Sequence, residues 1–267
     1  MPILLPFKLR NLTQQQFDER DGIVMRCAYA SQNALGRLCD ERVYENDLAR
    51  RLRAEGVSSV HTQVPIGVTH EDFAKEYRLD LVADDALYEL KTVNAFVPEH
   101  DTQALHYAML AEVSHAKLLN FRQAKVMGRL KFNALLGHKR RQVVWEEGAW
   151  RALSPSCKAL HAHLRALVLD WGAGLELALY QEALTRYFGG EARCLRRLPI
   201  ILAGVQLGTQ AVQMHSEGLS FLLTAFTAEL ESQESHIRRL LALTGLSAVQ
   251  WINFNHTTVR LTTVEKR

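Results

Sequence analysis

The chain has 267 residues, 48% of them hydrophobic, and a formal net charge of only +3. No apolar run approaches the roughly 20 residues that a membrane-spanning helix requires, which excludes a transmembrane protein. The balanced charge neither requires nor excludes nucleic-acid binding, because a local groove can be basic on a near-neutral protein.

The cysteines are few and scattered, and Cys27, Cys39, Cys157 and Cys194 form no C-x-x-C pair. Zinc and iron–sulfur sites usually need clustered thiolates, so the spacing favours reduced thiols in a cytosolic protein. The apolar segment 1–6 contains two prolines and is too short for a signal sequence. We therefore expect a cytoplasmic protein.

The first half of the chain alternates between helical and strand-like patterns. Tyr44, Leu48 and Leu52 fall on one helical face, and Pro98 suits the first turn of a helix. In chain order we expect a helix over about 22–55 ended by Gly56, strands over 59–68, 76–83 and 86–93, a helix from 98 to about 113, and strands over 116–121 and 129–135. This order predicts a mixed sheet with helices packed against it.

The basic run 137–141 is most simply a solvated connector between two halves. The second half repeats the pattern of the first, with a helix over 156–187, strands within 198–226, a helix over about 229–243 and a strand over 248–254. We expect an α/β protein of two tandem domains, 1–140 and 141–267, each with a mixed central sheet flanked by helices.

The two halves also align residue by residue, on a nearly constant offset. Residues 88–92 align with 221–225, and residues 119–121 align with 252–254, in both cases at an offset of 133. The polar residues Asp80, Glu89, Lys91 and Gln103 then fall opposite Gln213, Leu222, Thr224 and His236. A core residue must fill volume in both copies, whereas a catalytic residue is kept only where it acts. The alignment therefore indicates a tandem duplication whose second copy has lost a set of functional side chains.

Asp84 and Asp85 suit a two-residue turn between two strand-like runs. Such a turn pairs Asp80 with Glu89 across the hairpin and places Lys91, two residues further on, on the same face. Opposed like charges destabilise a hairpin unless something offsets them, and a divalent cation does so. The alternative is a pair of solvent-facing acids with Lys91 as a surface ion-pair partner. The loss of these side chains in the second half favours a functional site.

The pattern D-x(8)-E-L-K, preceded by a helical glutamate and followed by a helical glutamine, resembles the PD-(D/E)XK nuclease superfamily. Within that superfamily the chain is similar to the GxxExxY family. The matching blocks, in order, are Glu41–Tyr44, Gln63–Ile66, Arg78–Val82, Glu89–Val93 and Leu119–Phe121. The resemblance covers about residues 22–135.

The chain departs from the family pattern at two places. Leu38 stands where the family has a glycine three residues before Glu41. In the second half Gly174 and Tyr180 fit the pattern, but Leu177 takes the glutamate position, and neighbouring acid Glu176 is displaced by one residue. Since one residue on a helix rotates a side chain by about 100°, Glu176 is a poor substitute.

The resemblance implies a role for each residue. Asp80 and Glu89 would hold Mg²⁺ or Mn²⁺ with the backbone carbonyl of Leu90, and Glu41 would assist directly or through water. Lys91 would position the attacking water or neutralise charge on the phosphate. Gln103 would orient the site, and Tyr107, four residues on, would approach the nucleic-acid backbone. A packed Tyr107 with an exposed Gln103 is the structural alternative.

The function implied is a Mg²⁺-dependent nuclease that hydrolyses phosphodiester bonds in DNA, with RNA also compatible. The first domain would be catalytic, and the degenerate second domain would be structural, so that one chain forms an intramolecular pseudo-dimer. One alternative is a non-catalytic nucleic-acid-binding module. Another is a scaffold or assembly protein built on an inactive nuclease fold.

Several other residues are expected to be structural or exposed. Surface positions are the simplest interpretation of five histidines, His61, His70, His100, His106 and His115. The segment Trp251–Phe254 is expected to be a core strand, because its counterpart Leu118–Phe121 is equally apolar. The persistence of Tyr44 as Tyr180 favours a structural role for both tyrosines.

Overall fold

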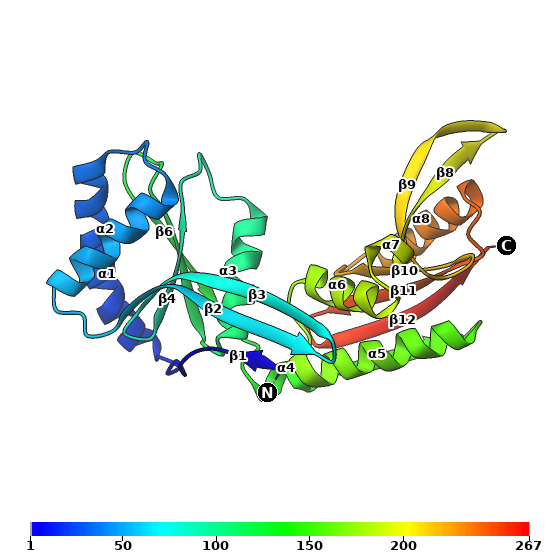
Figure 1. Cartoon of the computed structure of the whole chain (residues 1–267), viewed down its shortest axis with the longest axis horizontal. Coiled ribbons are helices and arrows are strands. Elements are labelled where there is room, and N and C mark those ends of the chain that lie inside the picture. Colours follow the sequence, from blue (N-terminus) through cyan, green and yellow to red (C-terminus); the bar gives the residue numbers. More distant parts are fainter. Residues whose placement is uncertain (1, 267) are drawn as a thin grey trace. The chain divides into compact units, whose positions relative to one another are not determined.

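A computed structural model describes residues 2–266, so the expected domain ends at Met1 and Arg267 lie outside the described residues. The chain forms two compact units, one built from residues up to Thr69 with Ala74–Gly137, the other from His70–Phe73 with the residues from His138 onward. The structure contains two six-stranded sheets, β1–β6 and β7–β12 (Figure 1). The protein is an α/β protein with two mixed sheets flanked by helices, as expected.

The first sheet has its strands in chain order, β1-β2-β3-β4-β5-β6. Its elements are β1 (Ile3–Leu4), α1 (Gln14–Leu35), α2 (Glu41–Ala54), β2 (Val60–His70), β3 (Phe73–Ala83), β4 (Ala86–Lys91), α3 (Pro98–Leu110), β5 (His115–Asn120) and β6 (Met127–Phe132). Strands β4 and β5 pair in parallel across the α3 crossover, whereas β3 with β4 and β5 with β6 pair antiparallel. The expected strands are all present, and β1 is an addition.

The expected single helix over 22–55 is wrong, because two helices occupy this region. Thr13 caps the start of α1 in a capping box with Gln16, and Gly36 ends the helix with a φ of 73°. That left-handed conformation is open to glycine and stops the helical path. The Tyr44 hydroxyl, on α2, donates to the Gly36 carbonyl oxygen at 2.8 Å and so fixes the break.

The helices of the first unit cover both faces of its sheet, with α1 and α2 on one side and α3 on the other (Figure 1). The core between the sheet and the first two helices includes Tyr44, Leu48, Leu81 and Leu90, all completely buried. The structural role of Tyr44 is thus confirmed. Since side chains alternate along a strand, the neighbours Asp80 and Glu89 point to the α3 face.

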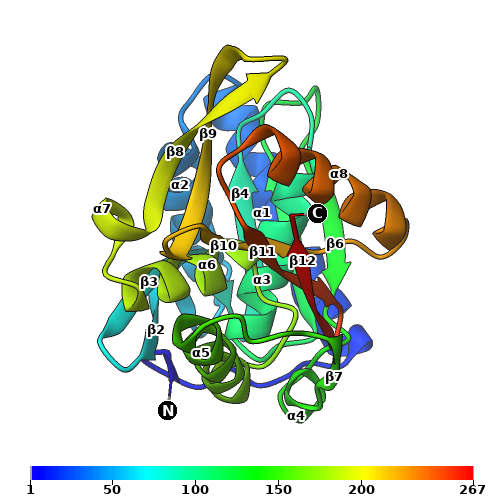
Figure 2. The same cartoon turned by 90° about the vertical axis from the view of Figure 1, so that its right-hand side faces the viewer.

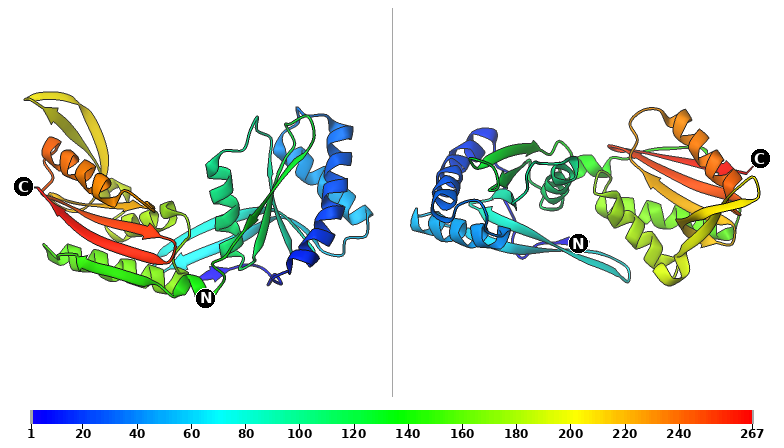
Figure 3. Two further views of the ribbon diagram at one scale, coloured as in Figure 1. Left: turned by 180° about the vertical axis from the view of Figure 1, so that it is seen from behind. Right: turned by 90° about the horizontal axis from the view of Figure 1, so that it is seen from above.

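The second sheet has the order β7-β12-β11-β10-β9-β8 (Figure 2). Its unit contains α4 (His138–Arg141), β7 (Val144–Ala149), α5 (Pro155–Trp171), α6 (Leu177–Tyr187), α7 (Glu191–Cys194), β8 (Leu195–Leu202), β9 (Val205–Ser216), β10 (Leu219–Thr224), α8 (Leu230–Leu243), β11 (Ala248–Asn255) and β12 (Thr258–Glu265). Helices α5 and α6 lie against one face and α8 against the other, and the view from above in Figure 3 shows such helical layers in each unit. The core position of Trp251–Phe254 on β11 is confirmed, because all four residues are buried.

Two expectations about the second half are wrong. The helix over 156–187 is broken at Gly172, which has a φ of 78°. The basic run is not simply solvated, because Arg140 is completely buried. Its Nε donates to the Trp171 carbonyl oxygen at 2.7 Å, and its own carbonyl accepts from the Ala173 N–H. Capping the end of α5 in this way requires a long cationic side chain.

The two units share structural details at corresponding positions. Glu89 pairs with Leu118 in the parallel ladder of the first sheet, and Leu222 pairs with Trp251 in that of the second. The Tyr180 hydroxyl donates to the Gly172 carbonyl, as Tyr44 does to Gly36. Each tyrosine also stacks on a phenylalanine, Phe121 directly after β5 or Phe254 in β11, with ring centroids 4.5 and 4.9 Å apart.

The units differ in their sixth strand and in one register. Strand β1 extends the first sheet beside β2, whereas β7 extends the second beside β12. The offset of 133 fails at β9: Tyr88 pairs with Leu81, but Phe221 pairs with Gln213. A bulge between Leu219 and Ser220 accompanies this shift of one residue.

Of the helices in residues 2–266, none combines the length and the apolar character needed to cross a membrane. The four cysteines are free, and three of them, Cys27, Cys157 and Cys194, are buried.

Candidate active site

The hairpin of β3 and β4 has the predicted turn. Asp84 and Asp85 have φ values of 43° and 71°, as the tight hairpin turns with two left-handed residues require. The pairs are Ala83 with Ala86, Val82 with Leu87, and Leu81 with Tyr88. The predicted register of the hairpin is thus confirmed over these three pairs.

Beyond Leu81, the side chain of Asp80 bonds to the backbone of β4. Its Oδ2 accepts from the Leu90 N–H at 2.8 Å, and the residue is only 9% exposed. Burial raises the pKa of Asp80, although the Leu90 N–H and the charge of Lys91 act to lower it.

Glu89 is the most heavily buried acid of the hairpin, at 3% exposure. Its Oε1 accepts from the Lys91 Nζ at 2.7 Å, whereas its Oε2 is buried without a hydrogen-bond partner. Burial, and then the charge of Asp80, raises the pKa of Glu89 to about 8 against the opposing effect of Lys91. The carboxyl therefore tends to be protonated at neutral pH unless a further cation lies beside it.

Lys91 lies on the face of Glu89, as the spacing predicted, and its side chain is only 11% exposed. Burial acts to lower the pKa of the ammonium, but the charges of Glu89, Glu41 and Asp80 outweigh it and raise the pKa. Lys91 therefore stays charged within a group of acids. The alternative of a solvent-facing salt bridge is wrong, because both partners are buried.

Helix α2 brings two glutamates to the same region. Glu41, the first residue of α2, has its pKa raised by burial and by Asp80, whereas Lys91 acts to lower it. Glu45, one turn later, is 1% exposed and was missed by the sequence analysis. Its position four residues after Glu41 puts both side chains on one helical face, which was the available signal.

Gln63 connects Glu45 to the hairpin. Its Nε2 donates to Glu45 Oε2 at 2.6 Å and approaches Asp80 Oδ1 at 3.4 Å. The other oxygen of Glu45 pairs with Arg42 at 2.5 Å. Gln63 has a φ of 52°, an uncommon conformation outside glycine that accompanies its insertion between the two acids. Gln63 lies in one of the blocks that resemble the superfamily, but its sequence position alone predicts no role for it.

Helix α3 supplies Gln103 and Tyr107, one turn apart. The Gln103 Nε2 donates to the Tyr107 hydroxyl at 3.2 Å, and Tyr107 is 9% exposed. Burial raises the pKa of the Tyr107 phenol; Gln103 acts to lower it, and the charges of Glu89 and Asp80 add to the increase. Tyr107 is therefore within electrostatic range of the carboxylates. Gln103 is connected to them only indirectly, through its hydrogen bond to Tyr107.

The donors of this site fit a divalent cation. Hard cations such as Mg²⁺ bind carboxylate and carbonyl oxygens, and Asp80, Glu89 and the Leu90 carbonyl supply both. The unpartnered Glu89 Oε2 is a buried acceptor with no other use in the structure. Glu41 does not form a close group of three donors with Asp80 and Glu89. Within residues 2–266, the one group of three His, Cys, Asp or Glu donors that lie within 4.8 Å of one another is His70, Glu71 and His163.

The corresponding place in the second unit has no acids. Leu222 packs against a cluster that includes Trp251 and Ile237. Thr224 is occupied structurally, because its hydroxyl donates to Asn253 and accepts from the Trp251 indole, both at 2.7 Å. Because of the shifted register of β9, the counterpart of Asp80 is the buried Val212 rather than Gln213.

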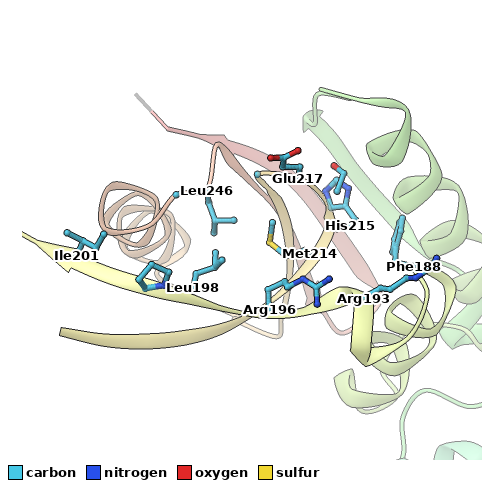
Figure 4. Close-up of a pocket in the computed structure, with 13 residues that line it drawn as sticks. Phe188, Arg193, Arg196, Leu198, Ile201, Met214, His215, Glu217 and Leu246 are labelled. Carbon is cyan, nitrogen blue, oxygen red and sulfur yellow. The ribbon is translucent and has the colours of Figure 1, made fainter. Parts of the chain in front are cut away.

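The second unit instead has a cavity of about 630 Å³, lined by apolar side chains and by Arg193, Arg196, His215, Ser216 and Glu217 (Figure 4). Burial lowers the pKa of His215 to about 4, so the ring is neutral. Its Nδ1 lies 2.9 Å from the Ser156 hydroxyl. None of the carboxylates of the first unit lines this cavity.

The expectation of surface histidines is wrong for His106 and His115, which are 2% and 6% exposed. His115 bonds to the Ser114 hydroxyl and to Gln14, and His106 packs edge-to-face against Tyr77 with ring centroids 4.7 Å apart. These contacts within the interior are not visible in the local sequence pattern.

Comparison with known protein families gives a match in the first half of the chain. Residues 18–131 match the PD-(D/E)XK nuclease superfamily. That part of the chain is therefore similar to a superfamily whose members are typically metal-dependent phosphodiesterases. The match includes every site residue from Glu41 to Tyr107 and ends before His138, where the main part of the second unit begins. Searches of curated proteins and of solved structures gave no match.

Proposed function

We propose that the first unit is a Mg²⁺-dependent PD-(D/E)XK nuclease of the GxxExxY family that hydrolyses phosphodiester bonds in DNA. The observation that carries the proposal is the buried Asp80–Glu89 pair, beside Lys91, with one carboxylate oxygen unpartnered. Burying like charges is unfavourable, and a fold has no need of it. A bound cation makes the arrangement favourable, and Mn²⁺ would suit the same donors.

A cation bound by Asp80, Glu89 and the Leu90 carbonyl would activate water and offset charge on the phosphate. The chain prepares the donors: the Leu90 N–H fixes Asp80, and Lys91 fixes one oxygen of Glu89. The proton that the raised pKa favours on Glu89 must leave before Oε2 can act as a ligand. Lys91 would then place a positive charge beside the scissile phosphate, with water exchange limited by burial.

Residues around Asp80, Glu89 and Lys91 would position these three side chains. Glu45 is held by Arg42 and Gln63, and Gln63 in turn approaches Asp80. Glu41 would assist the cation directly or through water. Gln103 would orient Tyr107, and the tyrosine would approach the phosphate backbone. Glu45 and Gln63 are added to the site by their contacts, and each acts through Asp80 rather than on the substrate.

The second unit would be a degenerate copy without catalysis, and would act as a built-in partner like the second subunit of a homodimer. Two parallels support the duplication: the parallel ladders share a register, and a tyrosine-to-glycine hydrogen bond occurs in each unit. The apolar Leu222 at the place of Glu89 supports the loss of activity.

One observation favours a scaffold as the second candidate function. The β8–β9 hairpin projects from the second unit (Figure 2), and Ile201, Leu202, Val205 and Leu207 at its tip are 46–64% exposed. Exposed apolar clusters of this kind often mark protein contacts. A scaffold would need no cleavage, so a nuclease assay separates the two functions.

The test is cleavage of single- and double-stranded DNA by the purified full chain with Mg²⁺, Mn²⁺ or chelator. We expect metal-stimulated cleavage that Glu89→Ala abolishes and that Glu76→Ala, a change of an exposed acid on β3, leaves intact. An RNA substrate in parallel decides the nucleic-acid class. Cleavage that survives Glu89→Ala would reject the proposed site, and salt-sensitive binding without cleavage would indicate a binding module.

A further inference from the structure

A second group of metal-ligand side chains lies in the second unit, away from the nuclease motif. One donor atom each of His70, Glu71 and His163 lies within 4.8 Å of the others. His70 and Glu71 belong to the short segment His70–Phe73 of this unit, and His163 lies on α5. These donors are two imidazoles and a carboxylate, which differ in chemistry from the oxygen donors around Asp80.

His70 is prepared as a ligand. Its Nδ1 lies 2.6 Å from Asp170 Oδ2, and its side chain is only 11% exposed. Its Nε2 is buried and has no hydrogen-bond partner. With Nδ1–H donated to a carboxylate, the lone pair of an imidazole lies on Nε2, which is the arrangement that carboxylate–histidine–metal sites use. A buried nitrogen acceptor without a partner is otherwise unfavourable.

His163 and Glu71 face each other without a hydrogen bond. The distance from His163 Nδ1 to Glu71 Oε2 is 4.0 Å, with the histidine side chain 18% and the glutamate 57% exposed. Donor atoms around a tetrahedral zinc ion lie roughly 3.3 Å apart, given metal–ligand distances of about 2.0–2.1 Å. A small side-chain movement of the exposed Glu71 therefore suffices to close the set.

The segment that carries His70 and Glu71 is anchored on both sides. Asp72 pairs with Arg186 of α6 at 3.1 Å, and Phe73 packs on Trp171 with ring centroids 5.8 Å apart. Leu167 and Leu184 line the same small pocket as the two histidines. The donors are thus held by a packed segment and an apolar wall, which limits competition from water.

We infer that His70, Glu71 and His163 bind a transition-metal dication, with Zn²⁺ the best fit. Two imidazoles and one carboxylate are a zinc donor set with the fourth position open to water or another ligand. Imidazole ligands disfavour Mg²⁺, which binds oxygen donors. Asp170 is a positioning residue that sets the tautomer and orientation of His70. The site is independent of the proposed nuclease function.

The inference is tested by calorimetric titration of Zn²⁺ into the metal-stripped full chain carrying Glu89→Gln, with Mg²⁺ in excess. The background variant and the Mg²⁺ prevent Zn²⁺ from occupying the carboxylate site. We expect one Zn²⁺ per chain, and binding at least about 10-fold weaker after His70→Ala or His163→Ala. Asp170→Asn should weaken binding about 10- to 100-fold, the usual effect of losing such a partner.

The matched control is His161→Ala, which removes a histidine of the same helix that contacts Glu147 instead and should leave Zn²⁺ affinity unchanged. Should either histidine variant fail to fold, Glu71→Gln decides, because this exposed side chain can change without loss of packing. Zinc affinity that is unchanged in His163→Ala or in Glu71→Gln would overturn the inference. So would the absence of Zn²⁺ binding by the parent chain.

Discussion

Strands β4 and β10 occupy the same place in their sheets, yet only β4 carries acids. Both are the middle partner of an antiparallel and a parallel neighbour, and both pair with the parallel strand in the same register. Glu89 and Lys91 of β4 correspond to Leu222 and Thr224 of β10. The second unit shows that an apolar residue suffices at this place, so the buried acid of the first unit is not needed for folding.

A second pair of corresponding residues, in contrast, is polar in both units. Asn120 and Asn253, at the ends of β5 and β11, are both buried. Each accepts from the backbone N–H and donates to the carbonyl of one residue, Val93 in the first unit and Phe226 in the second, and Asn120 also accepts from the Arg122 N–H. The same hydrogen bonds at corresponding positions of the two units indicate that these asparagines stabilise the fold.

The largest expected effect comes from changing Lys91 and Thr224 in parallel. Lys91→Ala should lower the cleavage rate at least about 100-fold, as the loss of one electrostatic contact to a transition state does. Thr224→Ala should leave cleavage unchanged, because its hydroxyl bonds only within the second unit. Single-turnover rates measure both. An equal loss of cleavage rate in the two variants would contradict the assignment of catalysis to β4 alone.

The asparagines should behave alike. Asn120→Ala or Asn253→Ala leaves a backbone N–H and carbonyl without a partner, which costs about 1–3 kcal/mol for each buried group. We expect each variant to lose about 3 kcal/mol of the free energy of unfolding in urea. A neutral effect at one of the two positions would show that the shared hydrogen bonds do not have a shared role.

The pH dependence of stability should differ between Glu89 and Leu222. Glu89 has a folded pKa of about 8, above its unfolded value, so the native state of the metal-free protein holds the proton more tightly. Its contribution is fully present below the unfolded pKa and is lost as pH rises through 8. Glu89→Gln should therefore exceed the parent in stability by on the order of 5 kcal/mol above pH 8, with little difference near pH 4.

The matched change in the second unit has no such profile. Leu222→Gln places an amide in an apolar cluster and should destabilise the protein equally at every pH. Chemical denaturation at several pH values in the presence of chelator measures both variants. A flat difference between Glu89→Gln and the parent would contradict the raised pKa of Glu89.

The smallest effect is expected from Tyr107→Phe. The change removes the hydroxyl that accepts from Gln103 and keeps the ring in place. Loss of one neutral hydrogen bond corresponds to about 3- to 10-fold in rate. A loss comparable to that of Lys91→Ala would move Tyr107 into direct contact with the reacting phosphate.

Local patterns predicted the hairpin well. Asp84 and Asp85 tolerate left-handed backbone, so the turn followed from the sequence, and strand periodicity then fixed the face of Lys91. The helix break at Gly36 was missed because apolar periodicity continues across it. It depends on a hydrogen bond to Tyr44, eight residues away.

Contacts between distant segments could not be read locally. Glu45 enters the site through Gln63, and the side-chain orientation of Gln63 depends on an irregular backbone in β2. Arg140 was assigned to the surface because basic runs usually are exposed, but the end of α5 needs its guanidinium. The one-residue shift in the register of β9 against β10 depends on a bulge, and an alignment at constant offset cannot show it.

The most direct measurement of the central claim is the rate of DNA cleavage by the full chain against Mg²⁺ concentration, for the parent and Asp80→Asn. Asp80→Asn keeps the size of the side chain and removes one charge from the buried pair. We expect a rate that rises to saturation with Mg²⁺ in the parent, is absent in chelator, and is lost in the variant. Cleavage that persists in chelator, or in Asp80→Asn, would contradict metal-dependent catalysis at the Asp80–Glu89 pair.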